Sequence, residues 1–292
     1  MNSVGLIGIG QMGMPMGKNL LKAGYSLNVY ARNKSSMDPL LSLGARSADT
    51  PRDVFASSET VLLALPAPKD VKEIIFGQNG LVSENPTENR IIIDTSTLDP
   101  KSSREIATSL ESVGVNYLDA PVSGGPEGAA NATLTFMVGG KRQVFDRCKP
   151  LFEMLGRNIV YLGPSGSGTG AKLVNQLLVA SGTIATAEAM QLSKALGLDS
   201  DQVIDVIRTS AGDSFIFRRV APKIAKDDLA GGWLAYLMDK DLRLLSETQR
   251  DLGLPSVSVK SSIPIFSEAV RSGMGNLDSA NLIKVLDKMR SN

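Results

Sequence analysis

The sequence predicts an α/β domain followed by an all-α domain. The chain has 292 residues, of which 42% are hydrophobic, and this is more than one compact core usually contains. In residues 1–163, short strand-like runs alternate with helical segments. In residues 164–292, the pattern is helical almost throughout. We therefore expect two domains, 1–163 and 164–292, with the glycine-rich stretch PSGSGTG at the boundary.

The strand candidates of the first domain are VGLIGI, SLNVY, TVLLAL, RIIIDT, NYLDA, LTFMVGG and NIVYL. Runs of β-branched residues and leucine, separated by helical segments, are typical of parallel βαβ units. In the second domain the one strand-like run is a weak VSV at 257–259. Residues 170–196 are rich in Ala, Leu and Val and carry almost no charge before Glu188, which predicts a long helix buried on most faces.

Charge and cysteine content exclude several classes of function. Lysine plus arginine (31) nearly equals aspartate plus glutamate (30), so the chain lacks the positive field that nucleic acid binding requires. The single cysteine, Cys148, cannot form an internal disulfide, which favours a reducing compartment, and we expect a cytoplasmic protein. Without histidine no zinc site of cysteine and histidine is possible, and we expect no metal. Residues 4–9 are interrupted by glycine and followed by a helical pattern, which indicates a strand and not a signal peptide or membrane span.

A glycine-rich loop follows the first strand candidate. Gly8, Gly10 and Gly13 form the pattern G-x-G-x-x-G, with Gln11 and Met12 between the last two glycines. In such a loop a tight turn, close approach of the backbone and a helix N-terminus together bind a pyrophosphate. Glycines also serve simple packing, so the triplet alone does not separate the two interpretations. Directly after a strand, it predicts an N-terminal Rossmann domain, here with extra strands, for binding a dinucleotide.

The end of the second strand candidate bears on the choice of cofactor. An NAD-preferring site normally carries an acid here to bind the ribose 2′-hydroxyl, and the turn NVYARNK has none. Ala31 leaves room, and Arg32, followed by Asn33, can pair with a 2′-phosphate as a planar fork. This favours NADP, with NAD as the second possibility. The alternative interpretation is a solvated basic turn.

Five motifs occur in order along the chain: GIGQMGMPMGKNLL, DTSTLDP, DAPVSGGPEGAANATLTFMVGG, GSGTGAKLVNQ and MDKDLRLL. Together they resemble the β-hydroxyacid dehydrogenase family, which includes 3-hydroxyisobutyrate dehydrogenases, tartronate semialdehyde (2-hydroxy-3-oxopropionate) reductases and glyoxylate/succinic semialdehyde reductases. The resemblance covers nearly the whole chain. The variant K-x-x-N-Q, formed by Lys172, Asn175 and Gln176, is more similar to the tartronate semialdehyde reductases than to members with K-x-x-N-N.

The resemblance implies roles for individual residues, with Lys172 as the catalytic acid/base. The residues implied to bind or orient the substrate are Ser123, Gly124, Gly125, Asn175, Gln176 and Lys240. Those implied to border the nicotinamide are Leu65, Pro66 and Thr97. The chain departs from the family pattern at Ala132, where glycine is usual, and at Ala31, where asparagine is usual. These departures leave the loop geometry and the affinity for adenosine open.

Elementary chemistry supports the role of the lysine. Carbonyl reduction needs a hydride at carbon and a proton at oxygen, and an ammonium beside the carbonyl both polarises it and supplies the proton. Free lysine titrates near ~10.4, so the reverse oxidation requires burial or a nearby cation to lower the pKa of Lys172. Lys240 is the candidate cation. The apolar neighbours of Lys172 in AKLV argue against a lysine on a solvated face.

Other polar residues have simpler explanations. Ser123 with two glycines can present a hydroxyl and N–H groups to a carboxylate, and an ordinary turn is the alternative. Asp94 and Asp119 end strand candidates, and we expect them to cap and orient the local backbone. Arg218 and Arg219 are expected on a solvated helix face.

We therefore expect an oxidoreductase with its active site between the domains. It would use NADP(H) to interconvert a small carboxylate-bearing (semi)aldehyde and its hydroxyacid, as in a tartronate semialdehyde reductase or 3-hydroxyisobutyrate dehydrogenase. The alternatives are a non-catalytic NADP-binding scaffold and an imine reductase on the same fold, although imine reductases typically carry another residue at the lysine position. The long apolar helix exceeds what a small domain can bury, which predicts a homodimer or homotetramer through the helical domains.

Overall fold

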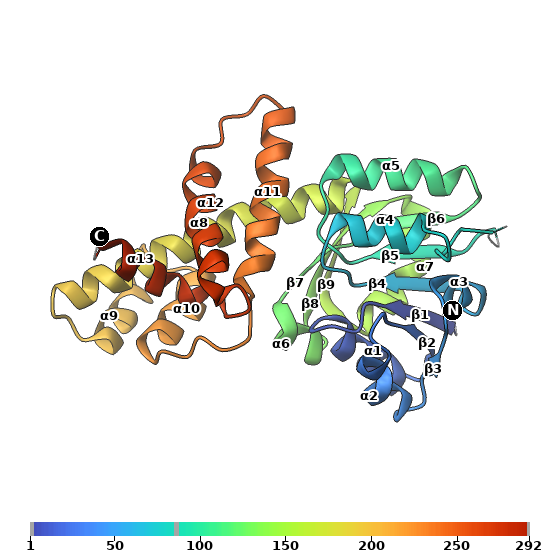
Figure 1. Cartoon of the computed structure of the whole chain (residues 1–292), viewed down its shortest axis with the longest axis horizontal. Coiled ribbons are helices and arrows are strands. Elements are labelled where there is room, and N and C mark those ends of the chain that lie inside the picture. Colours follow the sequence, from blue (N-terminus) through green and yellow to red (C-terminus); the bar gives the residue numbers. More distant parts are fainter. Residues whose placement is uncertain (1–2, 85–87, 291–292) are drawn as a thin grey trace. The chain divides into compact units, whose positions relative to one another are not determined.

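The computed structural model describes residues 3–84 and 88–290. The chain divides into two compact units, Met1–Lys172 and Leu173–Asn292. The first unit is a sheet with helices on both faces, and the second is helical (Figure 1). This confirms the predicted order of a Rossmann domain with extra strands and an all-helical part.

One sheet runs through the first unit in the order β3-β2-β1-β4-β5-β6-β8-β7, with β9 paired to β8. The strands are β1 Ser3–Ile7, β2 Ser26–Tyr30, β3 Arg46–Ser47, β4 Thr60–Leu63, β5 Ile91–Asp94, β6 Asn116–Asp119, β7 Val122–Ser123, β8 Leu134–Gly140 and β9 Gly156–Gly163. From β3 to β6 every pair is parallel. From β1 the chain adds β2 and β3 on one side and then β4, β5 and β6 on the other, so the strand order reverses between β1 and β4. In such sheets ligands bind outside the carboxyl ends of the strands at this point.

The far edge of the sheet departs from the predicted parallel pattern. β8 is antiparallel to β6 and β7, and parallel to β9. The chain returns from β7 to β8 through the six-residue helix α6 (Gly125–Ala130), which is too short to carry it across the sheet for a parallel pairing. The strands β3 and β7 were not predicted, because two-residue strands have no apolar run to mark them.

Helices cover both faces of this sheet. They are α1 Gly13–Lys22, α2 Asp38–Leu41, α3 Pro51–Ala56, α4 Pro68–Phe76, α5 Pro100–Glu111, α6 and α7 Arg142–Glu153, with a 3₁₀ helix η1 at Lys34–Met37. Successive strand residues point to opposite faces. Ile91 and Ile93 of β5 therefore pack in the core formed with α1, α2 and α7. Ile92 packs in the second core, formed with α3, α4 and α5.

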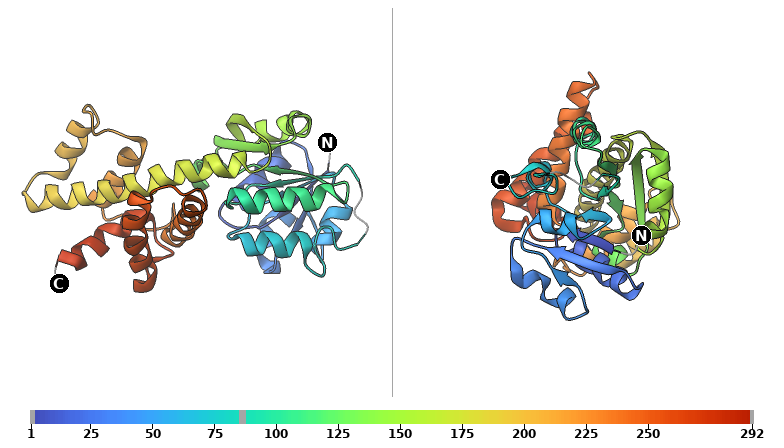
Figure 2. Two further views of the ribbon diagram at one scale, coloured as in Figure 1. Left: turned by 90° about the horizontal axis from the view of Figure 1, so that it is seen from above. Right: turned by 90° about the vertical axis from the view of Figure 1, so that its right-hand side faces the viewer.

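The second unit is built around the long helix α8 (Ser167–Ala195), which begins in the first unit and is unbroken (Figure 2). The other helices are α9 Ser200–Ile207, α10 Phe215–Ala225, α11 Ala235–Asp251, α12 Val257–Ala269, a π-helical turn η2 Val270–Met274, a 3₁₀ turn η3 Ser279–Asn281 and α13 Leu282–Arg290. The weak strand-like run at 257–259 is helical, in agreement with the helical pattern predicted for this part of the chain. These residues form the first turn of α12, whose buried Val259, Ser262, Phe266 and Ala269 follow helical spacing.

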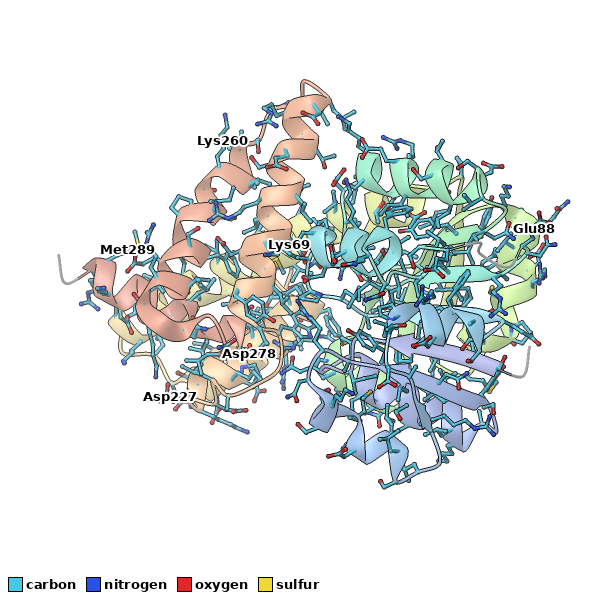
Figure 3. All side chains as sticks on the ribbon, turned by 45° about the vertical axis from the view of Figure 1, so that its right-hand side comes forward. Lys69, Glu88, Asp227, Lys260, Asp278 and Met289 are labelled. Atoms are coloured by element: carbon cyan, nitrogen blue, oxygen red, sulfur yellow. The ribbon has the colours of Figure 1, made fainter. Side chains whose placement is uncertain are left out.

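A buried carboxylate organises one end of the helical unit. Asp278, labelled in Figure 3, is fully buried and accepts hydrogen bonds from the Trp233 and Ala280 N–H groups and from the guanidinium of Arg219. The same guanidinium lies 3.9 Å from the centre of the Trp233 ring. The expectation of a solvated Arg219 is therefore wrong, because the buried Asp278 requires a cationic partner. Its neighbour Arg218 is exposed and pairs with Asp213, as expected for a solvated face.

None of the helices in residues 3–84 and 88–290 combines the length and the apolar character needed to cross a membrane.

The loop between α6 and β8 contains Ala132, one of the two departures from the family pattern. Ala132, where the resemblance led us to expect glycine, has a φ of 52°. This left-handed conformation is one that glycine adopts freely, whereas a Cβ costs about 1–2 kcal/mol there. The loop therefore keeps the backbone geometry that favours glycine and accommodates alanine with strain.

We predict that Ala132→Gly stabilises the protein by about 0.5–1 kcal/mol, because the relief of strain exceeds the extra entropy that glycine loses on folding. The urea midpoint of unfolding measures this change. Ala130→Gly, at an exposed position in α6, is the matched control and should destabilise instead. Equal losses in both variants would contradict the strain argument.

Candidate active site and cofactor loop

The glycine-rich loop has the geometry of a phosphate cradle. Gly8 has a φ of 98°, and a Cβ there would collide with the carbonyl oxygen of Ala64. A Cβ at Gly13 would collide with the carbonyl oxygen of Gly8, so this glycine lets α1 pack against β1. Around Gly10 a Cβ would meet no atom within 4 Å, which leaves the space that a close-lying ligand needs. The three glycines thus serve the turn, the helix packing and the ligand approach of a dinucleotide loop.

The start of α1 suits an anion. Its first turn contains no acidic residue, and the positive end of a helix together with its terminal N–H groups favours negative charge. Gln11 is exposed and Met12 half-buried between the strand and the helix. The residues present therefore fit the pyrophosphate of a nicotinamide dinucleotide.

Arg32 lies beyond the end of β2, with Ala31 before it and Asn33 after it. Its guanidinium lies 3.2 Å from the carboxylate of Asp70, in the first turn of α4, and its side chain is 74% exposed. Asn33 directly precedes η1 and accepts a hydrogen bond from Ser35 Oγ. The turn has no acid of its own, but α4 brings one to Arg32 that sequence reasoning missed. Nothing in the sequence indicated this ion pair, because Asp70 lies 38 residues after Arg32 in another βα unit.

The loops after β4 and β5 are tied together. The N–H of Leu65 donates to Ser96 Oγ (3.0 Å), and the N–H of Ser96 donates to Asp94 Oδ1 (2.9 Å). Asp94 also accepts from the Tyr117 hydroxyl, and its burial raises its pKa to about 6 despite these hydrogen bonds. Asp94 thus orients local backbone, as expected. The network brings the turn that contains Leu65, followed by the exposed Pro66, next to the segment that leads to the half-buried Thr97.

Ser123 ends β7 and is followed by two glycines in the left-handed region. Gly124 has a φ of 130° and Gly125 a φ of 63°. These conformations turn the chain sharply into α6. Consecutive N–H groups in such turns can converge on an anion, so the geometry suits both the carboxylate site and the ordinary turn considered above.

Lys172 lies in the second turn of α8 and is the last residue of the first unit. Its side chain is 9% exposed, which agrees with its apolar sequence neighbours. The preceding turn is fixed to the sheet by Asp119, whose two carboxylate oxygens accept from the N–H groups of Gly166 (2.8 Å) and Thr169 (2.9 Å). Asp119 therefore orients backbone, as expected, and the backbone that it orients belongs to the helix that carries Lys172.

The second unit brings together three of the predicted residues around Asp241. Gln176 donates from Nε2 to Asp241 Oδ2 (2.6 Å), and Lys240 Nζ lies 2.9 Å from Asp241 Oδ1. Asn175 donates from Nδ2 to Gln176 Oε1 (3.0 Å). Gln176 and Asp241 are buried, so the network is held away from solvent. The cation that we expected beside Lys172, Lys240, is thus paired with a carboxylate of its own helix, and its effect on Lys172 stays a prediction.

Sequence reasoning missed Asp241, although a signal was present. In α11 the buried residues Met238, Asp241, Leu242 and Leu245 follow helical spacing. A carboxylate at an otherwise apolar core position needs a buried partner. Here the partners are Gln176 and Lys240.

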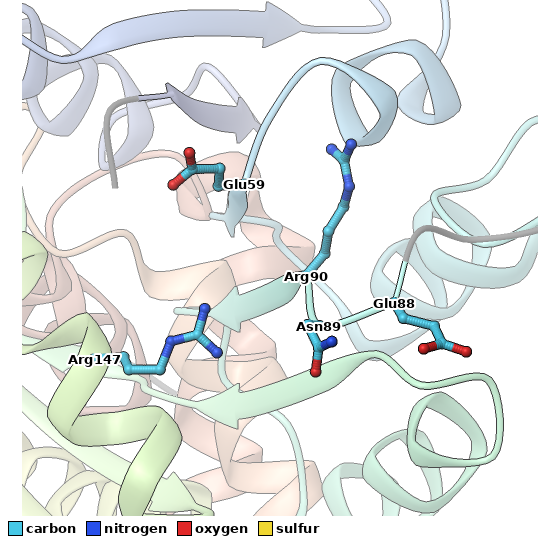
Figure 4. Close-up of a pocket in the computed structure, with 5 residues that line it drawn as sticks. All are labelled: Glu59, Glu88, Asn89, Arg90 and Arg147. Carbon is cyan, nitrogen blue, oxygen red and sulfur yellow. The ribbon is translucent and has the colours of Figure 1, made fainter.

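A crevice of about 250 Å³ lies elsewhere in the first unit (Figure 4). It is lined by Glu59, Glu88, Asn89, Arg90 and Arg147. Glu59 and Arg90 directly precede β4 and β5, so the crevice is at the amino-terminal edge of the sheet, opposite to the glycine loop. The guanidinium of Arg90 donates to the carbonyls of Phe55, Ala56 and Ser58. These bonds explain Arg90 as a structural residue.

Known proteins match the chain along nearly its whole length. Residues 3–163 match a family described as the NAD binding domain of 6-phosphogluconate dehydrogenase, and residues 166–286 one described as NAD-binding of NADP-dependent 3-hydroxyisobutyrate dehydrogenase. The chain is 36% identical to the NAD-dependent L-serine dehydrogenase of Pseudomonas aeruginosa, over 98% of each chain. It is 35% identical to the 2-hydroxy-3-oxopropionate reductase of Escherichia coli, over 98% of this chain and 97% of the relative.

A solved structure has the same fold. The 3-hydroxyisobutyrate dehydrogenase of Mycobacterium tuberculosis, determined with L-serine, has a TM-score of 0.89 and 29% sequence identity, and the match covers 98% of this chain and 99% of that chain. The sequence matches, the glycine loop and the order of the strands agree with one another. The chain therefore belongs to the β-hydroxyacid dehydrogenase family and is an oxidoreductase that uses a nicotinamide cofactor.

Proposed function

We propose that the protein uses NADP(H) to interconvert a small carboxylate-bearing semialdehyde and its β-hydroxyacid, with Lys172 as the general acid and base. The observation that carries this proposal is that Lys172 is buried in the second turn of α8. The first turn of this helix is hydrogen-bonded to Asp119 at the carboxyl end of β6. Lysine is seldom buried in proteins, and burial brings its pKa closer to the range that proton transfer requires. In parallel sheets this edge is also where cofactors bind.

The chain's own residues would handle the proton and the carboxylate. When bound, the nicotinamide supplies the hydride for the carbonyl carbon. In reduction the ammonium of Lys172 donates a proton to the carbonyl oxygen, and in oxidation the neutral amine takes it back from the hydroxyl. Ser123 with the N–H groups of Gly124 and Gly125 would bind the carboxylate. Asn175 and Gln176 follow Lys172 by three and four residues in the same helix and would orient substrate and lysine.

The names of the relatives indicate the substrate class. L-Serine, 3-hydroxyisobutyrate and the alcohol formed from 2-hydroxy-3-oxopropionate are all three-carbon acid backbones with a hydroxyl at the β carbon. They differ in the small group at the α carbon, which is an ammonium, a methyl or a hydroxyl. A pocket separates a methyl from a smaller group by only about 1–3 kcal/mol. Our first candidates are tartronate semialdehyde, which the K-x-x-N-Q variant favours, and the 3-hydroxyisobutyrate pair. A panel of these acids and semialdehydes, followed by NADPH absorbance, tests this choice.

We predict that Lys172→Ala lowers turnover by about 10²- to 10⁴-fold, because a general acid is lost. Lys172→Arg keeps the positive charge but does not give up its proton, so it should stay severely impaired in oxidation, where a neutral base is required. Turnover in both directions measures these effects. NADPH affinity, expected to stay within about twofold of the wild-type value, is the control for folding.

The same variants distinguish the alternatives. A non-catalytic scaffold would bind NADPH but reduce none of the semialdehydes, with or without Lys172. An imine reductase would reduce cyclic imines in preference to semialdehydes. Near-normal turnover of Lys172→Ala on a good semialdehyde would overturn the catalytic role.

The preference for NADP(H) is supported by Arg32 and by the absence of an acid in its turn, whereas Asp70 beside Arg32 opposes it. We predict that Arg32→Asp raises the Kd for NADPH about 10- to 100-fold, since a hydrogen bond to a charged group contributes about 1.5–3 kcal/mol. Affinity for NADH should hold or improve. Fluorescence titration with both cofactors measures this.

Lys34→Asp is the matched control, because it reverses an exposed charge in the same turn, where Lys34 pairs with Asp49. It should change NADPH affinity much less than Arg32→Asp. Wild-type protein that binds NADH as tightly as NADPH would contradict the argument from this turn.

We also propose that a second copy of the chain packs on α8. Three residues of α8, Val174, Leu178 and Leu192, and Leu196 directly after it are all more than half exposed. Their spacing is helical and places them on one side of the helix. Monomeric proteins rarely expose apolar stripes of this length. A twofold interface uses the same patch on both subunits, and an uncharged stripe can pack against its own copy.

We predict a dimer or tetramer by sedimentation at micromolar concentration, and a shift toward monomer for Leu192→Glu, which places a charge in the stripe. Leu43→Glu, at a comparably exposed leucine after α2, is the control and should not change the assembly. A monomeric wild-type protein would disprove the interface.

A further inference from the structure

We propose that Asp119 is a positioning residue for Lys172, because its buried carboxylate holds the first turn of α8 to the sheet and so fixes where the next turn presents the lysine. The inference rests on the proposed role of Lys172. It assigns to Asp119 a task beyond ordering local backbone, since the element that it holds carries the reacting group.

The contacts of Asp119 with α8 are specific and buried. Asp119 is the last residue of β6 and has no exposed surface. One carboxylate oxygen accepts from the N–H of Gly166, and the other from the N–H of Thr169. The Thr169 hydroxyl lies 3.3 Å from the second oxygen. Both oxygens are thus used on a segment 47 and 50 residues further along the chain.

The same turn is seated directly on strand backbone. A Cβ at Gly168 would collide with the carbonyl oxygens of Met137 in β8 and Asp119 in β6. A Cβ at Gly139 would reach the Asp119 carboxylate. Backbone therefore packs against backbone here, and a displacement of Asp119 should displace the first turn of α8.

The segment before α8 cannot fix the helix by itself. The two glycines directly before α8, Gly163 and Gly166, are both left-handed, and its first turn contains two more, Gly168 and Gly170. Glycine-rich backbone loses much conformational entropy when it becomes ordered. Lys172 follows Thr169 by three residues, about 4.5 Å along the helix axis. A displacement of the first turn therefore moves the lysine by a similar amount, and a misplacement of 1 Å can cost about 10²-fold in rate.

The carboxylate also places a negative charge at the positive end of α8. Burial raises the pKa of Asp119, while its hydrogen bonds from Gly166 and Thr169 oppose that rise. The other titratable or charged groups near Asp119 are Asp94 of β5, Tyr117 of β6 and Arg104 of α5, which lies beside Gly166. Loss of the Asp119 charge should favour the neutral form of a lysine one turn further on.

The test is Asp119→Asn, assayed with the best substrate of the semialdehyde and hydroxyacid panel. We expect kcat to fall by about 10²-fold, with the Kd for NADPH within about twofold of the wild-type value. In oxidation, the pH at which activity rises should shift downward, because the base loses a nearby negative charge. A merely structural role would lower the melting temperature without moving that pH.

Asp278→Asn is the matched control, since it is the same change at a fully buried carboxylate that contacts Trp233, Ala280 and Arg219 and not the first turn of α8. It should leave the pH of the rising limb in place. Should Asp119→Asn fail to fold, Gly168→Ala decides, because it displaces the same turn without changing charge and should also lower kcat.

The inference would be overturned if folded Asp119→Asn had the kcat and the pH profile of the wild type. It would also be overturned if Gly168→Ala had the kcat of the wild type. If Lys172→Ala is inactive in that case, only the positioning role fails. If Lys172→Ala is itself active, the proposed function fails first.

Discussion

Close packing of backbone against backbone at the carboxyl edge of the sheet is the constraint on which the rest of the site depends. Gly8 and Gly13 let the first loop and α1 approach β1 and β4, and Gly168 lets α8 approach β6 and β8. At each point a Cβ would meet a carbonyl oxygen, which cannot move aside as a side chain can. The cofactor loop and the start of the helix that carries Lys172 are therefore held by the same sheet edge, and both lie in the first compact unit.

The proposed role of Lys172 in proton transfer makes demands that a histidine would not. The lysine ammonium must be kept from bulk water, must be placed with respect to the carbonyl, and must be able to lose its proton in oxidation. Lys172 is among the buried residues, and burial in general disfavours the charged form of a lysine. Lys240, the neighbouring cation that the sequence suggested, is paired with Asp241.

Local patterns in the sequence were sufficient for the order of the elements. The apolar runs that became β1, β2, β4, β5, β6, β8 and β9 were visible, as were the glycine loop and the long helix. The failures have physical causes. The strand β8 runs antiparallel to β6 because of a short connection that composition does not reveal. Arg219 with Asp278, and Asp119 with Gly166, are partners 59 and 47 residues apart, so only the folded chain shows them. The roles of the predicted site residues stay predictions. The burial of Asp241 could have been predicted from the helical spacing of the apolar residues around it.

Asp94 links folding to proton uptake. In the unfolded chain its carboxyl group would titrate near the ordinary value of 3.8, whereas in the fold its pKa is about 6. Between these values the folded protein holds a proton that the unfolded chain releases, so folding takes up a proton. The contribution of this group to stability is greatest below the lower value and is lost as the pH rises through about 6. At neutral pH the turn that anchors Leu65 therefore contains an ionised carboxylate, and the cost of burying its charge has to be met by the hydrogen bonds from Ser96 and Tyr117 and by the packing around them.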